Sequence, residues 1–232
     1  MVSNDVEGLA VGEACEALLL TAKARVIAPL VAWRRGADDF LLLAEPELGQ
    51  VVGAHLTRMR LAAKAEIELE EHESVVVFGG VGGIPTRDYG EPAVEMLDSG
   101  VQPTLTDDEL ELLRIRAGTP RWGKEIDDRV LPAEAGLDER AISFTKGCYP
   151  GQEPVARLRY RGHANRSLRV LEIEGVVLPE YDAEVLRDGK AVGRVTSAAG
   201  DGDCVVALAY VRVEVPPDAV VEVVGRRAVP AG

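Results

Sequence analysis

Residues 146 to 153 have the sequence Lys146-Gly147-Cys148-Tyr149-Pro150-Gly151-Gln152-Glu153. This segment places a thiol, an ammonium group and a carboxylate close together, between two glycines that permit positive φ angles. The residues from 152 to 161 contain no glycine, and the proline at 154 suits the first turn of a helix. We therefore predict a tight loop that leads into a helix, with a short strand over 141–144 before it.

Two interpretations of Cys148 follow from this placement. A position near a helix N-terminus, with Lys146 two residues away, favours the thiolate over the thiol and therefore favours reactivity. Free cysteines are also among the most buried residue types, so Cys148 could equally be a small core residue beside a structural turn. The residue types alone leave both interpretations open.

The composition is that of an acidic globular protein. The chain has 232 residues, 47% of them hydrophobic, and a net charge of −13. No apolar run approaches the roughly 20 residues of a membrane span. The first residues lack the basic start and apolar stretch of a signal peptide, so we expect a cytoplasmic protein. The negative charge opposes non-specific nucleic-acid binding, and we expect no direct contact with nucleic acid or with a membrane.

The cysteines argue against a metal-binding or disulfide-rich protein. Cys15, Cys148 and Cys204 are widely spaced, and they form no Cys-x-x-Cys pair. Neither a disulfide framework nor a zinc site is expected from such a pattern. An iron–sulfur cluster usually needs about four thiolates, so we predict no metal ligands and no stably held cluster.

The region before the motif predicts an α+β unit. Apolar runs predict strands over 14–20, 26–34, 40–43, 65–69 and 75–78. Apolar residues at helical spacing predict a helix over 46–64, and a capping box at Thr106 predicts a second helix through about Arg116. The glycine-rich stretch 79–92 is expected to be a flexible loop over a pocket. A dinucleotide site is disfavoured because Pro85 stands where that motif has its last glycine.

The sequence pattern changes after Ser167. Short apolar runs predict strands over 168–173, 184–186, 191–196, 205–213 and 220–224. The residues Arg187-Asp188-Gly189-Lys190 are a strong hairpin signal. Five or six short strands with little helix predict a small barrel or sandwich, and we therefore divide the chain into regions 1–166 and 167–232.

A basic run follows the motif. It consists of Arg157, Arg159, Arg161, Arg166 and Arg169, with His163 among them. In an acidic protein this run could form an anion site. It could equally be a solvated helix face that pairs with acidic side chains, and both interpretations stay open.

The motif resembles K-G-C-[FY]-x-G-Q-E of the YgfZ-type folate-binding proteins. These are relatives of the aminomethyltransferase, or T-protein (GcvT), of the glycine cleavage system. Residues 113–118 resemble the L-R-x-x-A-G segment of the family, residues 161–166 its R-G-x-x-N-R segment, and residues 193–197 its G-x-V-T-S segment. The resemblance implies an α+β, GcvT-like fold in which interleaved subdomains surround a central folate pocket, with a small β-barrel at the C-terminus.

The resemblance also implies roles for individual residues. Cys148 would be the working thiol, with Lys146 tuning it and with Gln152 and Glu153 fixing the loop. Arg114 aligns with an arginine that contacts folate in T-proteins. A glutamate tail would be bound by guanidinium groups, which Arg114 or the basic run after position 157 could supply.

The pterin end of the folate implies an acidic partner, because a carboxylate can accept two hydrogen bonds from an amino-pyrimidine edge. The loop that carries this residue in the family resembles residues 87–91, which include Tyr89. Either Glu91 or Glu95 could be the carboxylate. Asp5 lies in a segment, 4–6, that resembles T-N-D-[VI] of the family.

Besides the loop at 87–91, whose spacing is shorter than in the T-protein and leaves the choice between Glu91 and Glu95 open, two departures from the family pattern bear on function. Only three residues precede Asn4, where the family has a strand and a helix. We therefore expect either a misassigned start or an incomplete first subdomain, which would leave one side of the folate pocket open. The second departure is Ala28-Pro29, which stands where the T-protein pattern has a pair of aspartates. Neither residue can take a proton, so methylene transfer would lose its carboxylate.

The resemblance therefore implies a tetrahydrofolate-binding accessory protein in iron–sulfur protein maturation or repair, and thereby in tRNA modification. Its partners would be folate and iron–sulfur client or assembly proteins. We do not expect a true aminomethyltransferase. The alternatives are a tetrahydrofolate-dependent aminomethyltransferase or other one-carbon transferase, and a scaffold that binds no folate.

Overall fold

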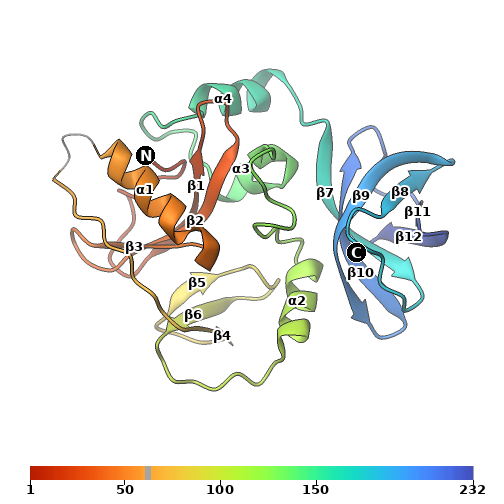
Figure 1. Cartoon of the computed structure of the whole chain (residues 1–232), viewed down its shortest axis with the longest axis horizontal. Coiled ribbons are helices and arrows are strands. Elements are labelled where there is room, and N and C mark those ends of the chain that lie inside the picture. The colour runs from red at the N-terminus through yellow and green to blue at the C-terminus, as the bar shows by residue number, and fades with distance from the viewer. Residues whose placement is uncertain (61–63, 232) are drawn as a thin grey trace.

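The computed structural model describes residues 1–60 and 64–231 of the chain. Figure 1 shows an N-terminal sheet with helix α1 on the left, a second small sheet below it, helix α4 at the top and a β-barrel on the right. The predicted α+β architecture with a C-terminal barrel is confirmed.

The N-terminal sheet is an antiparallel meander in the order β1-β2-β3. Its strands are β1 (Ala14–Leu20), β2 (Val26–Arg34) and β3 (Phe40–Leu43), as the sequence predicted. A short 3-10 helix η1 (Pro46–Leu48) leads into α1 (Gly49–Met59). The predicted helix over 46–64 is thus confirmed through Met59, and its residues 61–63 lie outside the described part of the chain.

The alternation of side chains in β1 gives the sheet two buried faces. Ala17 and Leu19 pack with α1, whereas Leu18 and Leu20 face a second core beneath the motif. This alternation follows from the two-residue period of a strand.

The second sheet has the order β4-β6-β5. Its strands are β4 (Ser74–Phe78), β5 (Ile84–Thr86) and β6 (Ala93–Leu97). The stretch 79–92, predicted as a flexible loop, contains the strand β5. The strand β6, which follows this stretch, was not predicted either. The glycines serve close packing here, since a Cβ on Gly83 would lie 2.7 Å from the carbonyl oxygen of Glu95.

The predicted strand over 65–69 is wrong, because residues 64–73 have no regular structure. Exposed ion pairs hold this segment in place. Glu70 pairs with Arg35 at 2.8 Å and with His72 at 3.0 Å, and His72 also contacts Asp98 at 2.7 Å. Residues 65–69 pair with no other strand, so their alternating apolar pattern did not by itself produce a strand.

The region between the second sheet and the barrel is helical. Its elements are α2 (Asp107–Arg116), the 3-10 helix η2 (Pro132–Glu134), α3 (Leu137–Arg140) and α4 (Gln152–Arg161). The capping box of α2 is confirmed, with the hydroxyl of Thr106 accepting a hydrogen bond from the backbone N–H of Glu109.

The predicted strand over 141–144 is also wrong. Its backbone groups bond to a residue near the N-terminus, where no ladder can form. The hydroxyl of Ser3 donates to the carbonyl of Ala141 at 2.6 Å, and the N–H of Ser143 donates to the carbonyl of Ser3 at 3.0 Å.

The C-terminal region is a closed antiparallel barrel in the order β10-β7-β12-β11-β8-β9. Its strands are β7 (Arg166–Glu174), β8 (Glu184–Arg187), β9 (Lys190–Asp201), β10 (Cys204–Arg212), β11 (Val221–Val223) and β12 (Arg226–Pro230). The hairpin at 187–190 is confirmed, with Asp188 and Gly189 at positive φ. The strand β12 was missed.

The barrel packs directly on the rest of the chain. Ile115 of α2 contacts Val206 and Leu208 of β10, and Tyr210 reaches into the core beneath the motif. The division at residue 166 stays a prediction, although the first barrel strand begins at Arg166.

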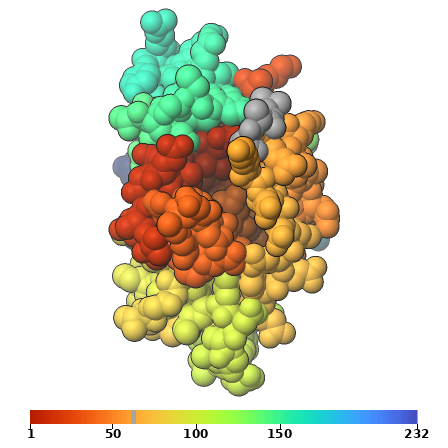
Figure 2. Space-filling model, turned by 90° about the vertical axis from the view of Figure 1, so that its left-hand side faces the viewer, coloured from red at the N-terminus to blue at the C-terminus, as the bar shows by residue number. Residues whose placement is uncertain are grey.

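Figure 2 shows the face that carries α1, with a hollow between the N-terminal strands in red and orange and the amber segment that includes α1. Among the described residues, no helix is long and apolar enough to cross a membrane. Residues 1–60 and 64–231 also contain no group of three or more His, Cys, Asp or Glu side chains placed to hold a metal ion.

We predict that Gly193→Ala destabilises the barrel by about 3 kcal/mol, because overpacking against backbone cannot be relieved by a side-chain movement. A Cβ at Gly193 would lie 2.2 Å from the carbonyl oxygen of Tyr210 on the adjacent strand. Urea unfolding followed by circular dichroism measures the change.

Gly200→Ala on the same strand is the matched control. A Cβ at Gly200 would meet no atom within 4 Å. We expect this variant to be neutral or stabilised by up to about 1 kcal/mol. Equal stabilities of the two variants would contradict the packing argument.

Candidate functional site

The motif loop lies between α3 and α4 and exposes Cys148 to solvent. Helix α4 begins at Gln152, and Gly151 caps it with a φ of 82°. A Cβ on Gly151 would lie 2.6 Å from the carbonyl oxygen of Thr21 in the β1–β2 turn. The glycine is therefore required twice, for its backbone angle and for its close approach to the N-terminal sheet. The interpretation of Cys148 as a core residue is wrong, because its side chain is exposed.

Lys146 ties the same loop to the N-terminus. Its Nζ donates hydrogen bonds to the carbonyl oxygens of Val2 at 3.0 Å and Asn4 at 2.9 Å. The ammonium group thus has backbone acceptors at this position, and the tuning of Cys148 by Lys146 stays a prediction.

Tyr149 lies next to the thiol but points into the protein. It is buried in the core beneath the motif, with the Lys146 Nζ 6.0 Å from its ring centroid. Its buried hydroxyl has no hydrogen-bond partner among the described residues, and burial raises its pKa. The phenol is therefore neutral at physiological pH.

The other two motif residues with predicted roles lie at the start of α4. Glu153 is exposed and pairs with Arg157 one helical turn later at 2.9 Å. Gln152 is half-buried, and its backbone N–H donates to the carbonyl of Tyr149 at 3.3 Å, which closes the turn.

A set of polar residues far apart in sequence meets beside the motif loop, and we call it the central polar cluster. Its members are Asn4, Glu16, Asp88 and Arg140. The amide of Asn4 donates to the carbonyl of Glu16 at 2.7 Å. The Arg140 guanidinium bonds to the carboxylates of Glu16 at 2.7 Å and Asp88 at 2.5 Å. Burial raises the pKa of Glu16, and the bonds to Arg140 oppose this shift.

This cluster links several predicted site residues into one region. The backbone carbonyl oxygen of Asn4 accepts a hydrogen bond from the Lys146 ammonium group. In the sequence, Asp5 follows Asn4 and Tyr89 follows Asp88. Glu16, Asp88 and Arg140 were not predicted as site residues, and of the three only Asp88 lies in a segment, 87–91, to which the family resemblance points. Arg140 and Glu16 are 124 residues apart in the chain.

Tyr89 is half-buried and packs edge-on against Phe78 at a centroid distance of 6.0 Å. Burial and the neighbouring charges of Asp88 and Glu95 raise the pKa of Tyr89 to about 12. The phenol therefore keeps its proton and can donate a hydrogen bond.

The remaining predicted acids differ in environment. Glu95 lies in β6 and accepts a hydrogen bond from the Ser74 hydroxyl at 2.5 Å. Glu91 is exposed in the loop before β6. Asp5 is exposed, and its carboxylate accepts the backbone N–H of Gly8 at 3.3 Å. Their roles in binding stay predictions.

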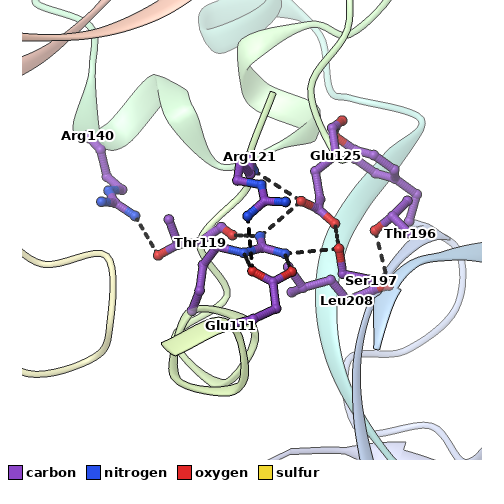
Figure 3. A network of polar contacts seen from close by, with 10 residues as sticks. Glu111, Thr119, Arg121, Glu125, Arg140, Thr196, Ser197 and Leu208 are labelled. Carbon is purple, nitrogen blue, oxygen red and sulfur yellow. Dashed lines mark hydrogen bonds and ion pairs between the residues drawn. The ribbon is translucent and has the colours of Figure 1, made fainter. Parts of the chain in front are cut away.

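Arg114 lies at a different place, in a buried network between α2 and the barrel. Figure 3 shows this network, with its partners Glu111, Thr119, Glu125 and Ser197 labelled. The Arg114 guanidinium donates to both carboxylate oxygens of Glu111, to the carbonyl of Thr119, to Glu125 at 3.0 Å and to the hydroxyl of Ser197 at 2.9 Å. These bonds use every N–H donor of the guanidinium. The contact between Arg114 and folate stays a prediction. It would require one of these hydrogen bonds to break.

Glu125 completes the network and was not anticipated from the sequence. Its side chain is 1% exposed. Its carboxylate accepts hydrogen bonds from Arg114, from the Ser197 hydroxyl at 2.6 Å and from the backbone N–H of Arg121 at 3.0 Å. Its carbonyl accepts the Tyr210 hydroxyl at 2.9 Å. No local pattern marks this residue, because its partners come from α2 and from two barrel strands.

The comparison with known proteins agrees with this architecture. The chain superposes over its full length on the crystal structure of the glycine cleavage system aminomethyltransferase T from Bartonella henselae. The TM-score is 0.84, the sequence identity is 20%, and the match covers 78% of that chain. No family model matches the sequence.

Three relatives illustrate the sequence similarity. The chain is 25% identical over 210 residues to an uncharacterized protein of Haemophilus influenzae, a match that covers 85% of this chain and 75% of that protein. It is 32% identical over 157 residues to an aminomethyltransferase of Nostoc sp. and 38% identical over 117 residues to the tRNA-modifying protein YgfZ of Edwardsiella ictaluri. The chain is thus similar in sequence to members of the aminomethyltransferase-like superfamily, and it shares the fold of one of them.

The extent of these matches differs between relatives. The matches cover 60% of this chain and 41% of the Nostoc aminomethyltransferase, and 48% of this chain and 35% of the Edwardsiella protein. The chain thus matches less than half of the length of either superfamily member.

We predict that Glu125→Gln lowers the free energy of unfolding by about 3 kcal/mol, because it leaves the buried guanidinium of Arg114 without one of its two carboxylates. Urea unfolding followed by circular dichroism measures this change. Glu153→Gln is the control, since it breaks an exposed ion pair and should change stability by less than about 0.5 kcal/mol. Equal effects of the two variants would show that the buried network does not hold the barrel in place.

Proposed function

We propose that this protein is a tetrahydrofolate-binding accessory protein that acts through Cys148 in the maturation or repair of iron–sulfur proteins, and thereby in tRNA modification. The observation that carries the proposal is an exposed thiol on a loop that is fixed at both ends. Lys146 holds one end through the carbonyls of Val2 and Asn4, and Gly151 packs on the carbonyl of Thr21 at the other.

This arrangement suits a working thiol. The backbone around Cys148 is held by groups distant in sequence, while the sulfur itself stays open to a partner. A buried structural cysteine would need neither feature. The similarity to the tRNA-modifying protein YgfZ of Edwardsiella ictaluri supports the same role.

The structure of β2 speaks against aminomethyl transfer. Ala28 is fully buried and packs with Leu19 and Leu30 in the core beneath α1. Pro29, the next residue, pairs with Leu18 across the sheet. Neither position offers a carboxylate to the reacting atoms, and an acid at position 28 would have to be buried among apolar side chains.

The side chains near the second sheet fit the chemistry of a folate. Glu91 and Glu95 are carboxylates that suit an amino-pyrimidine edge, and Tyr89 is a protonated phenol beside them. Arg87 is exposed and makes no ion pair within the described residues, so it is available for a glutamate carboxylate. When bound, tetrahydrofolate would supply a one-carbon carrier. The chain's own residues would bind and orient it.

The runner-up function is a tetrahydrofolate-dependent aminomethyltransferase or other one-carbon transferase. The fold shared with the Bartonella enzyme and the similarity to the Nostoc aminomethyltransferase favour it.

In the proposed accessory role, the iron–sulfur cluster is cargo that a partner protein carries. The three scattered cysteines fall short of the roughly four thiolates that hold a cluster.

We predict that Cys148→Ser fails to restore iron–sulfur enzyme activity in a strain whose own copy of the gene is deleted, because serine cannot supply a thiolate. The measurement is the activity of an iron–sulfur enzyme in extracts, relative to rescue by the unchanged protein. Cys204→Ser, which alters a cysteine at the start of β10, should restore it fully. Full rescue by Cys148→Ser would remove the thiol from the proposal.

We predict that the purified protein binds tetrahydrofolate, and that either Glu91→Gln or Glu95→Gln weakens binding about tenfold, because a charge-assisted hydrogen bond contributes about 1.5 kcal/mol or more. Calorimetric titration measures the affinity and identifies which carboxylate contacts the pterin. An absence of binding to the unchanged protein would leave only a scaffold role. Formation of methylene-tetrahydrofolate from an aminomethyl donor at about 1 per second or faster would establish the transferase instead.

A further inference from the structure

A second candidate site lies beside α4, on the surface that carries the basic run after the motif. It is a groove of about 590 Å³ whose apolar lining includes Val155 and Leu158 of α4, Leu131 and Pro132 around η2, and Val213 after β10. This volume falls in the range of roughly 300–1,000 Å³ that is typical of small-molecule sites. Neither the central polar cluster nor Arg114 lines it, and we call it the α4 groove.

The groove also has a basic lining, which is unexpected in a chain with a net charge of −13. Arg157, Arg159, Arg161 and His163 all line it, whereas Asp138 is the acidic residue there. Arg157 pairs with the highly exposed Glu153. Solvent screens such an exposed pair, so it offsets little of the positive charge of the groove. Within the described residues Arg159 and Arg161 make no ion pair, so the positive charge is left uncompensated.

Arg159 is held in a defined position by aromatic stacking. Its guanidinium lies over the ring of Phe144 at 4.2 Å from the centroid, and Phe144 in turn meets Tyr160 edge-on at 6.2 Å. Stacking fixes the plane of a guanidinium and leaves its N–H edges free to bind an anion. The side chain is therefore preorganised without being neutralised.

The position of these residues at the end of α4 has an ordinary explanation, because cations near a helix C-terminus interact favourably with its dipole. That explanation covers the sign of the charge. It does not account for the apolar groove beside the arginines or for the scarcity of acidic residues around it. An apolar surface bordered by unpaired guanidinium groups is complementary to an anion with an apolar body.

We propose that the α4 groove binds a free small molecule that carries a carboxylate or similar anionic group on an apolar body. The apolar part would contact Leu158, Val155 and Leu131, and the anionic group would be bound by Arg159 and Arg161. None of Arg87, Tyr89, Glu91 and Glu95, the residues proposed for tetrahydrofolate, lines the groove. This site is therefore separate from the proposed tetrahydrofolate site and stands independently of it.

The test uses the full chain and the fluorescent probe 8-anilinonaphthalene-1-sulfonate, an aromatic body with one anionic group. We expect saturable binding that Arg159→Gln/Arg161→Gln weakens about fivefold, because the variant removes two exposed charge contacts to the sulfonate. The double variant Arg58→Gln/Arg60→Gln is the matched control. It removes the same charge from the end of α1 and should bind the probe like the unchanged protein.

A second arm uses N-phenyl-1-naphthylamine, which has the same aromatic body without the sulfonate. We expect it to bind more weakly than the sulfonate and to be insensitive to Arg159→Gln/Arg161→Gln. Circular dichroism checks that all variants are folded. The proposal is overturned if the unchanged protein shows no saturable binding, if the α4 double variant binds as well as the α1 control, or if the neutral probe shows the same dependence. Competitive displacement by tetrahydrofolate would overturn it as well, because the probe would then occupy the folate site.

Discussion

The buried ion pair between Arg114 and Glu125 is the interaction on which the arrangement of the protein depends. It joins α2, the irregular connection after α2 and the β9 strand of the barrel through Ser197. Tyr210 of β10 adds a hydrogen bond to the backbone of the same glutamate. A buried charge of this kind is costly unless every partner is in place, so the barrel, α2 and the connection have to assemble together. The motif loop packs on a core that includes Tyr210, and it therefore depends on this assembly.

The segments that carry the family resemblance consequently divide into two kinds. Arg114 and Ser197 belong to the buried network, Gly193 makes a close contact with the β10 backbone, and Arg166 pairs with Glu134 while stacking on Tyr210. These residues have structural partners that explain their presence. Cys148 is different, because its exposed thiol has no packing role that would require sulfur.

The sequence predicted the elements whose signals are local. Apolar runs identified the first three strands, a capping box identified α2, and a two-residue turn identified the β8–β9 hairpin. The errors lie where the backbone finds partners far along the chain. Residues 141–144 bond to Ser3 and form no strand, whereas the glycine-rich stretch near Gly83 packs on β6. A local pattern contains no information about such partners, since they become neighbours only after folding.

The sequence by itself predicted an α+β, aminomethyltransferase-like fold and the position of the Cys148 thiol in its motif, because a dense motif and regular periodicities are properties of short segments. The tertiary structure decided which polar side chains meet across the fold. It brought Asn4, Glu16, Asp88 and Arg140 together from separate elements, and it turned Arg114 into the centre of a buried network. Cys148, ambiguous as a residue in a turn, became an exposed thiol because Lys146 and Gly151 anchor its loop on opposite sides.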